Sequence, residues 1–270
     1  MFCIWARAGP EGSSGIVRNA RCDRQERAKG HPKMTGYNYS EFSTGDYDFD
    51  RVGGPDVGDK APDFSLLTTD GEMKNILDFA GEFLVLETGS ITCSLFQSRR
   101  GIMETLDRQD GVSTAVLYVR EAHPGSDVPG HRSFDDKTAC ATRLKAEDGE
   151  TRTVFIDDLE GHAHMAYGSM PNAVFIINRN GCVVYRSEWN NPSATRKALQ
   201  ALLAGREITA RDYFRPARPT TVFRTLSKAG KGSAADFFRG LPFLIWTNII
   251  KRNLRLLFGR PKSGSARTTC

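Results

Sequence analysis

A single cysteine follows an apolar run and stands where a helix should begin. FLVLET at 83–88 indicates a buried strand, and SLFQSRRGIMETLDRQ at 94–109 spaces its apolar side chains on one helical face. Cys93 therefore lies at the N-terminal end of the predicted helix, where free N–H groups and the helix dipole favour a thiolate. The sequence predicts a lowered pKa for the Cys93 thiol and a nucleophilic role, with a hydroxyl beside it on Thr92.

Two further reactive side chains follow the next predicted strand. VSTAVLYV at 112–119 is β-branched and apolar, and it leads into Glu121 and His123. Because parallel strands place their carboxyl ends at one edge of a sheet, we expect both residues near Cys93. His123 could then act as a general acid or base, with Glu121 orienting it. An exposed turn residue is the alternative interpretation of His123.

The spacing of the six cysteines restricts the redox chemistry. No cysteine lies three residues after Cys93, so an oxidised Cys93 would need a distant or external thiol to reduce it. Cys140 is a candidate resolving thiol, although a residue of the helix core is its more common role. Cys182 is interpreted as sheet packing and Cys270 as a tail residue. The pattern is neither a disulfide framework nor a metal site, so we expect free thiols, a cytoplasmic protein, no metal, and no cofactor besides an external thiol reductant.

The elements that position these groups follow in the order β-α-β-α-β-α-β-β-α. Asn-Gly at 180–181 predicts a hairpin between the last two strands, because this dipeptide accepts the positive φ angles of a tight turn. This order predicts an α/β thioredoxin-like fold, with a mixed central sheet, helices on both faces and an antiparallel hairpin at one edge. The predicted strands are 83–88, 112–119, 152–158, 173–178 and 182–187, and the predicted helices are 94–109, 134–146, 161–168 and 192–205.

Three motifs resemble the iodothyronine deiodinase family and its bacterial deiodinase-like redoxins. GSITCSLF at 89–96 is similar to the active-site stretch, with Cys93 where animal members carry selenocysteine, and LYVREAHPGSD at 117–127 is similar to the Glu-Ala-His segment. YGSMP at 167–171 is similar to a third motif, which places Pro171 at the cis-proline position of thioredoxin folds. The resemblance implies a substrate pocket near Ser90, Tyr167 and Pro171, and reductive removal of a halogen or reduction of a peroxide or disulfide.

The departures from the family pattern concern the substrate. Two prolines that follow selenocysteine in the family are Ser94 and Leu95 here, and a Glu-Arg pair after the motif proline is Asn172 and Ala173. Because that arginine helps to clamp the hormone in animal enzymes, its loss disfavours thyroid hormone as the substrate.

Two alternatives to a deiodinase-like enzyme remain open. A slow peroxiredoxin-type peroxidase is one, although the positions of the peroxiredoxin Thr and Pro hold Ser90 and Gly89. A non-catalytic, membrane-associated adaptor of thioredoxin fold is the other. The reactivity of Cys93 would separate the enzymes from the adaptor.

The C-terminal part is basic and contains an amphipathic stretch. Residues 205–270 hold 14 Lys and Arg against 3 Asp and Glu, within a chain of net charge +5. One predicted side of the helix at 234–260 is apolar and the other is polar and basic, which favours the surface of an anionic membrane. Packing against the redox domain or a second subunit is the alternative, and nucleic acid is disfavoured. The membrane-binding residues would be Trp246, Ile249, Ile250, Lys251, Arg252 and Arg255.

The composition predicts five segments along the chain. Residues 1–56 are expected to be disordered or extended, with Met34 as an alternative start, and 57–205 to form the redoxin domain. A linker at 206–233, the amphipathic helix at 234–260 and a disordered tail at 261–270 would follow. No stretch is apolar over the ~20 residues that a membrane-spanning helix needs. We expect a cytoplasmic protein, peripheral on the inner membrane face if the helix binds lipid, and leave a homodimer open.

Overall fold

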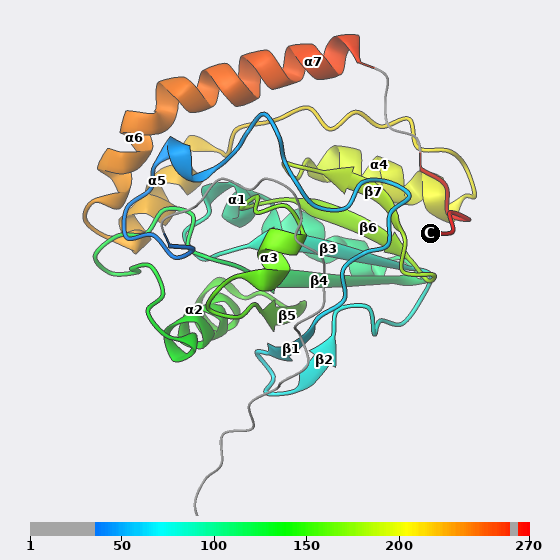
Figure 1. The fold of residues 1–270 in the computed structure, drawn as a ribbon, viewed down its shortest axis with the longest axis horizontal. Helices are drawn as coiled ribbons and strands as arrows, with labels where there is room; N and C mark the ends of the chain where they lie inside the picture. Colours follow the sequence, from blue (N-terminus) through cyan, green and yellow to red (C-terminus); the bar gives the residue numbers. More distant parts are fainter. Residues whose placement is uncertain (1–35, 260–263) are drawn as a thin grey trace, which may run out of the picture. The chain divides into compact units, whose positions relative to one another are not determined.

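The computed structural model describes residues 36–259 and 264–270 of the chain (Figure 1). These residues belong to one compact unit, Met34–Cys270. The predictions on residues 1–35, including the alternative start at Met34, lie outside the described residues.

A seven-stranded mixed sheet, in the order β2-β1-β5-β4-β3-β6-β7, organises this unit (Figure 1). The three central strands β3, β4 and β5 are parallel, and β6 and β7 extend the sheet as the predicted antiparallel hairpin. A second hairpin, β1–β2, pairs antiparallel to β5 at the other edge. Its strands were not predicted because they are only four and three residues long. The strands are β1 (Ser65–Thr68), β2 (Met73–Asn75), β3 (Phe83–Gly89), β4 (Val112–Tyr118), β5 (Thr153–Ile156), β6 (Val174–Asn178) and β7 (Val183–Ser187).

Helices cover both faces of the sheet, which confirms the predicted thioredoxin-like α/β fold. On one face, apolar side chains of α1 (Ser94–Met103), α2 (Phe134–Asp148) and α4 (Pro192–Leu203) pack against alternate residues of the strands. On the other face, α3 (His162–Ala166) and the N-terminal segment pack against the intervening strand residues. A turn of 3-10 helix, η2 (Glu104–Arg108), continues α1.

The described part of the predicted N-terminal segment packs on the domain. Phe42 and Tyr47 are buried in the core, on either side of the 3-10 turn η1 (Thr44–Asp46). The guanidinium of Arg120 lies 4.8 Å from the ring centroid of Tyr47 and donates a hydrogen bond to the carbonyl of Asp46. Residues 36–56 are therefore not disordered, because a buried cation after β4 holds their aromatic side chains.

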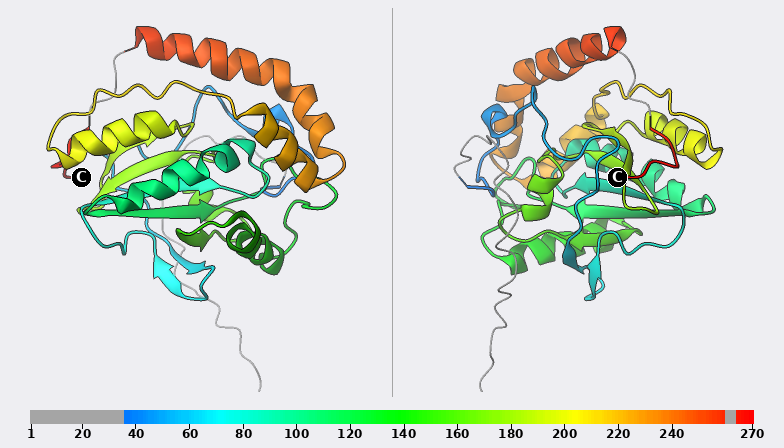
Figure 2. Two further views of the ribbon diagram at one scale, coloured as in Figure 1. Left: turned by 180° about the vertical axis from the view of Figure 1, so that it is seen from behind. Right: turned by 45° about the vertical axis from the view of Figure 1, so that its right-hand side comes forward.

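The segments after α4 also differ from the prediction. The expected linker 206–233 contains a helix, α5 (Pro219–Ala229). The helix expected at 234–260 comprises α6 (Ser233–Leu244), a π-helical segment η3 (Ile245–Arg252) and α7 (Asn253–Phe258). Figures 1 and 2 show these three elements as one continuous helix that runs past the edges of the sheet. No helix among residues 36–259 and 264–270 is long and apolar enough to cross a membrane.

The described end of the chain is attached to the sheet rather than disordered. The Asn178 side chain donates hydrogen bonds to the carbonyls of Ala266 and Thr268, and Cys270 forms a disulfide with Cys182. The expectation of free thiols is therefore wrong for these two cysteines. It failed because cysteines separated by 88 positions give no local signal that the tail returns to the hairpin.

Candidate functional site

Cys93 lies at the predicted position, directly before the first residue of α1. Its backbone carbonyl accepts the Gln97 N–H at 3.0 Å, the first hydrogen bond of the helix. The preceding strand ends at Gly89, where a Cβ would lie 2.3 Å from the ring of Phe96. Only glycine therefore lets the first turn of α1 fold back over the end of β3.

The environment of the Cys93 thiol is apolar, and this reverses the predicted direction of its pKa. Only 2% of Cys93 is exposed, and burial raises the pKa of the thiol to about 11. The N–H groups of Phe96 and Leu95 and the charge of Arg99 favour the thiolate, as the helix position predicted, but they do not outweigh desolvation. The prediction of a lowered pKa was wrong because the covering segments come from distant parts of the sequence.

Thr92 joins the cysteine to a buried carboxylate. Its hydroxyl donates to Glu121 Oε2 at 2.6 Å, and its N–H donates to the same oxygen at 3.0 Å. The other oxygen, Oε1, accepts the hydroxyl of Tyr118 and lies 3.1 Å from Nε2 of His131. These four residues, which we call the carboxylate network, connect the ends of β3 and β4 with the loop before α2. Thr92 therefore contacts Glu121 and not, as expected, the thiol.

The carboxylate network keeps a charged group inside the protein. Burial alone would raise the pKa of the Glu121 carboxyl, but hydrogen bonds from His131, Thr92 and Tyr118 outweigh it and hold the pKa below its ordinary value. Burial and the neighbouring carboxylate raise the pKa of Tyr118, so its hydroxyl keeps its proton. His131 was not predicted from the sequence, because a histidine in the loop before a helix N-cap has no spacing that pairs it with Glu121.

His123 is near the cysteine but is not paired with Glu121 as predicted. Its imidazole packs edge-on against Phe42 and Phe237, with ring centroids 4.5 and 5.2 Å apart. Burial lowers the pKa of His123 to about 4, so the ring is neutral near pH 7. Its backbone N–H donates to Thr92 Oγ1 at 3.2 Å, and its Nδ1 is buried without a hydrogen-bond partner.

A cavity of about 390 Å³ lies against Cys93. Its walls come from the N-terminal segment, the start of α1, the loop after β4 and the C-terminal helices. Most lining side chains are aromatic or aliphatic, and two of the polar ones, His123 Nδ1 and Ser94 Oγ, are buried atoms without a partner. The lining includes Phe42, Tyr47, Phe49, Cys93, Ser94, His123, Pro171, Trp189, Phe214, Val222, Phe237, Leu244 and Ile249.

Of the three residues expected around a substrate pocket, one lines the cavity and two do not. Pro171 lines the cavity, but no peptide bond among the described residues is cis, so the expected cis-proline is wrong. Ser90 is buried away from the cavity, where its hydroxyl accepts the Ala122 N–H at 3.2 Å. Tyr167 is buried under the sheet and donates to the Pro62 carbonyl at 2.6 Å. Both support the backbone and neither lines the cavity.

Cys140 lies beside the carboxylate network rather than in the cavity. Its sulfur, a Glu121 oxygen and a His131 nitrogen lie within 4.8 Å of one another, an arrangement that could hold a zinc ion. Glu121 and His131 already bond each other, however, and burial raises the pKa of Cys140 to about 12. Cys140 also packs against the apolar cluster that contains Cys93.

A second charged cluster lies behind the cysteine. Glu87 in β3 forms an ion pair with Arg152 at 2.8 Å and accepts the amide of Asn172 at 2.8 Å, and all three side chains are buried. Asn172 in turn accepts a hydrogen bond from Arg99 at 2.9 Å. Asn172, which replaces the family's glutamate, therefore belongs to the core and is not available to a ligand.

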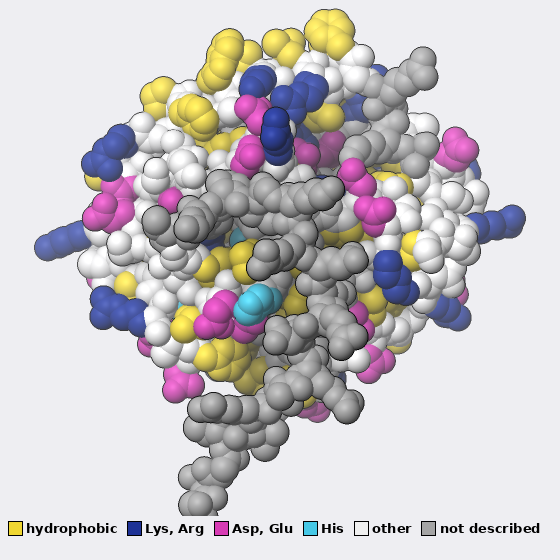
Figure 3. Space-filling model, viewed as in Figure 1, with side chains coloured by type: hydrophobic (Ala, Val, Ile, Leu, Met, Phe, Trp, Pro, Cys, Tyr) yellow, Lys and Arg dark blue, Asp and Glu magenta, His cyan; other side chains and the backbone are white. Residues whose placement is uncertain are grey.

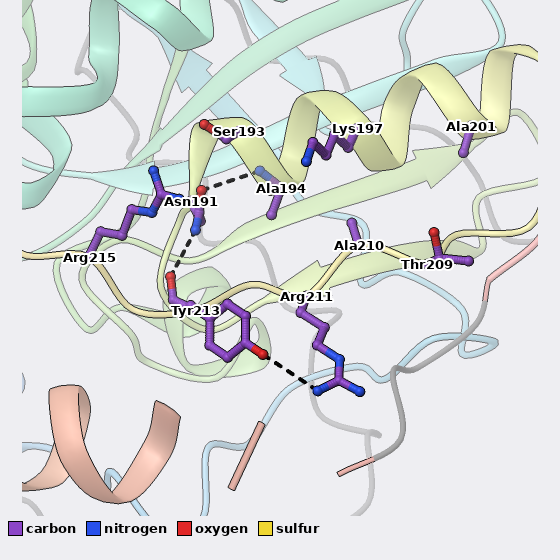
Figure 4. Close-up of a pocket in the computed structure, with 10 residues that line it drawn as sticks. All are labelled: Asn191, Ser193, Ala194, Lys197, Ala201, Thr209, Ala210, Arg211, Tyr213 and Arg215. Atoms are coloured by element: carbon purple, nitrogen blue, oxygen red, sulfur yellow. Dashed lines mark hydrogen bonds between the residues drawn. The ribbon is translucent and has the colours of Figure 1, made fainter. Parts of the chain in front are cut away.

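A second cavity, also of about 390 Å³, lies between α4 and residues 209–215 (Figure 4). It is polar and basic, and Lys197, Arg211 and Arg215 line it. Arg211 donates to the Leu256 carbonyl at 2.9 Å and so holds the end of the C-terminal helix. No cysteine is among the residues that line this cavity.

The residues expected to bind a membrane do not share one surface. Arg252 is buried and pairs with Asp212 at 2.7 Å, so its expected contact with lipid is wrong. Ile249 lines the cavity at Cys93. Lys251 and Arg255 form ion pairs with Asp50, at 2.7 and 3.5 Å, and all three side chains are partly exposed. Trp246 and Ile250 are exposed as expected.

Comparisons with known proteins show which proteins and which family this chain is similar to. Among solved structures, the chain is similar to the DsbE-type thiol:disulfide interchange protein of Chlorobium tepidum, with 23% identity and a TM-score of 0.44 over 56% of this chain and 98% of that one. It is also similar to a peroxiredoxin-like protein of Aquifex aeolicus, with 21% identity and a TM-score of 0.41 over 55% and 90%. The family model of iodothyronine deiodinase matches residues 28–203. The chain therefore belongs to the iodothyronine deiodinase family, and it is a thiol-dependent oxidoreductase.

Proposed function

We propose that Cys93 is the single nucleophile in the reduction of an apolar electrophile bound in the adjacent cavity. One observation carries the proposal: Cys93 lines the apolar cavity, and the residue before it is bonded to a buried carboxylate. The cavity can therefore bind the substrate beside the sulfur, while the carboxylate network holds the backbone next to Cys93. His123, by contrast, is neutral near pH 7 and acts by packing and by offering Nδ1 to the substrate.

The reaction begins with the neutral thiol. Its sulfur attacks either the halogen of an aryl halide or the distal oxygen of an organic hydroperoxide, and the carbon–halogen or O–O bond breaks. The electron pair of that bond stays on carbon or on the proximal oxygen, which receives the thiol proton, while the hydrogen bonds of Thr92 to Glu121 hold the backbone beside Cys93 in place. Cys93 is left as a sulfenyl halide or a sulfenic acid. One external thiol displaces the halide or water to form a mixed disulfide, and a second thiol releases Cys93.

The substrate class follows from the cavity. Aromatic and aliphatic side chains favour an apolar body, and the unpartnered His123 Nδ1 and Ser94 Oγ favour one small polar group close to the sulfur. Ala173 stands where the family's clamping arginine would be, so no cation at that position binds a carboxylate of the substrate. A protein disulfide is disfavoured, because only 2% of Cys93 is exposed.

We propose an external thiol as the reductant of Cys93, and a compartment that supplies such thiols. Cys140 does not line the cavity, so an external thiol is a more direct reductant of Cys93 than Cys140. We keep the cytoplasm as the proposed compartment because it supplies such thiols, although the Cys182–Cys270 disulfide is of a kind that persists chiefly in oxidising compartments. A resolving role for Cys140 stays a prediction.

A single-turnover experiment tests this function. Reduced full-length protein is mixed with excess 4-iodophenol or cumene hydroperoxide, and halide release, peroxide loss and the mass of the Cys93 peptide are followed. We expect about one equivalent of product and an oxidised Cys93 peptide. Cys93→Ser should remove the burst, and Cys140→Ser should leave it unchanged. A burst that survives in Cys93→Ser would refute the role of this cysteine, and no burst with either substrate would favour the non-catalytic adaptor.

A further inference from the structure

The C-terminal helix presents an apolar surface to the outside of the protein. Six side chains spaced along one stripe of η3, α7 and the end of α6 are exposed, among them Trp246 at 58% and Phe258 at 84%. We call this stripe the apolar ridge, and Figure 3 shows hydrophobic side chains along this edge of the molecule. It consists of Phe243, Trp246, Ile250, Leu254, Leu257 and Phe258.

The opposite side of the same helix packs on the redoxin domain and is hydrogen-bonded to it. Asn248 accepts the indole N–H of Trp189 at 2.8 Å, and Arg252 pairs with Asp212 at 2.7 Å. Asn253 accepts the backbone N–H of Phe214 at 2.7 Å and donates to its carbonyl at 3.1 Å. These contacts fix the rotation of the helix, so the ridge cannot turn inward without breaking buried polar pairs.

The cavity at Cys93 opens beside this surface. Phe223, Phe238 and Ile245 line the cavity and are also exposed, at 58%, 45% and 40%. Side chains that line a cavity and are also exposed to solvent lie at its mouth. The mouth is therefore formed by α5, α6 and η3, the elements that also carry or adjoin the ridge.

The charge around the ridge indicates what covers it. Residues 219–258 contain seven Lys or Arg, of which five pair with carboxylates of the described residues, so the excess positive charge near the ridge comes from Arg224 and Lys231. Arg224, Lys231 and Arg239 are exposed on or between α5 and α6. A second copy docking through this face would bring like charges together, whereas an anionic surface would be attracted. At 1.5 Å per residue the ridge from Phe243 to Phe258 is about 23 Å long, which suits a flat interface, and a tryptophan on it is typical of interfacial helices.

We propose that the apolar ridge docks on an anionic lipid bilayer and that the substrate of Cys93 enters from the lipid phase. The substrate is then a bilayer-soluble molecule with a long or bulky apolar body and one small polar reactive group, such as a lipid hydroperoxide. The docking part of this proposal is argued from the ridge and the charge near it. The substrate part rests on the function proposed above.

The experiment uses full-length protein and sedimentation with vesicles. Phosphatidylcholine vesicles with and without phosphatidylglycerol are compared, and the ridge variant carries Trp246→Ser, Leu254→Ser and Leu257→Ser, none of which lines the cavity. The matched control carries Met73→Ser, Met165→Ser and Leu203→Ser, which remove three exposed apolar side chains elsewhere. We expect wild type and control to bind the anionic vesicles with similar affinity. The affinity of the ridge variant should be lower by about tenfold or more.

Cys93→Ser separates the two proposals, because it should bind vesicles as wild type does even if no turnover is found. Wild type that stays in the supernatant, or a ridge variant that binds equally, would overturn the docking. The docking would also be overturned if wild type were a dimer, the ridge variant a monomer, and neither bound vesicles. That result would assign the ridge to self-association. For the substrate half, the ridge variant should lose about tenfold in rate on a phospholipid hydroperoxide in vesicles and keep its rate on tert-butyl hydroperoxide. Equal rates on both would overturn lipid-phase entry.

Discussion

The two sides of the Thr92–Cys93 peptide are built in opposite ways. On the Thr92 side, the carboxylate network is buried and charged, and each oxygen of Glu121 has a donor. On the Cys93 side, the cavity is mainly apolar, and buried polar atoms of His123 and Ser94 have no partner. A satisfied network holds its geometry, whereas unpartnered atoms leave bonds for a ligand to make. Positioning of the cysteine and binding of the substrate are therefore assigned to different residues.

The largest expected effect comes from removing the charge of the network. Glu121→Gln should lower the single-turnover rate about 10²-fold, because a small displacement of the reacting sulfur costs about that much, and change KM little. Tyr118→Phe is a second variant that keeps the carboxylate and deletes one donor, and it should give a smaller loss. Stopped-flow kinetics would measure both. A raised KM with an unchanged rate would contradict the separation of the two sides.

The reactivity of the free thiol should depend strongly on pH. Because burial raises the pKa of Cys93 to about 11, the thiolate fraction should rise tenfold for each pH unit below that value. Alkylation by iodoacetamide should accelerate about 100-fold from pH 7 to pH 9 and still be rising at pH 10. Peptide mass spectrometry follows Cys93, with Cys140 as the slower internal control. A plateau below pH 8.5 would show that the helix terminus, and not burial, dominates the pKa.

Filling the cavity should affect binding and leave the positioning of the cysteine intact. Val222 lines the cavity from α5, so Val222→Trp should raise KM for a bulky hydroperoxide about tenfold, because the added ring occupies the space of the substrate. The rate with hydrogen peroxide should change little. Thr220→Trp is the matched control, since Thr220 is exposed on the same helix. Equal effects of the two tryptophans on KM would argue against this cavity as the substrate site.

The disulfide should contribute to stability and not to chemistry. Neither Cys182 nor Cys270 lines the cavity, so Cys270→Ser should leave the single-turnover rate within about twofold. Closing a loop of 88 residues usually stabilises a protein by about 2–4 kcal/mol, and the variant should unfold at lower denaturant concentration. Urea unfolding and the burst assay check both. A lost burst would place this disulfide in the reductive cycle.

The local sequence determined the parts of this protein that depend on neighbours in the chain. Alternating and helical spacings gave the central strands and helices, and the position of Cys93 before α1 followed from where FLVLET ends. Glu121 was expected near Cys93, and a hydrogen bond through Thr92 joins the two residues. These predictions succeeded because hydrophobic periodicity and chain order need no knowledge of distant residues.

Only the tertiary structure decided the pKa of the cysteine, the partners of the carboxylate and the direction of the amphipathic helix. The desolvation that raises the pKa of Cys93 comes from a domain core and cavity walls that include residues about 120 to 155 positions further along the chain. His131 reaches Glu121 through a loop, and Arg252 finds Asp212 across 40 residues. Desolvation and charge pairing depend on distance in space, so no local pattern could predict them.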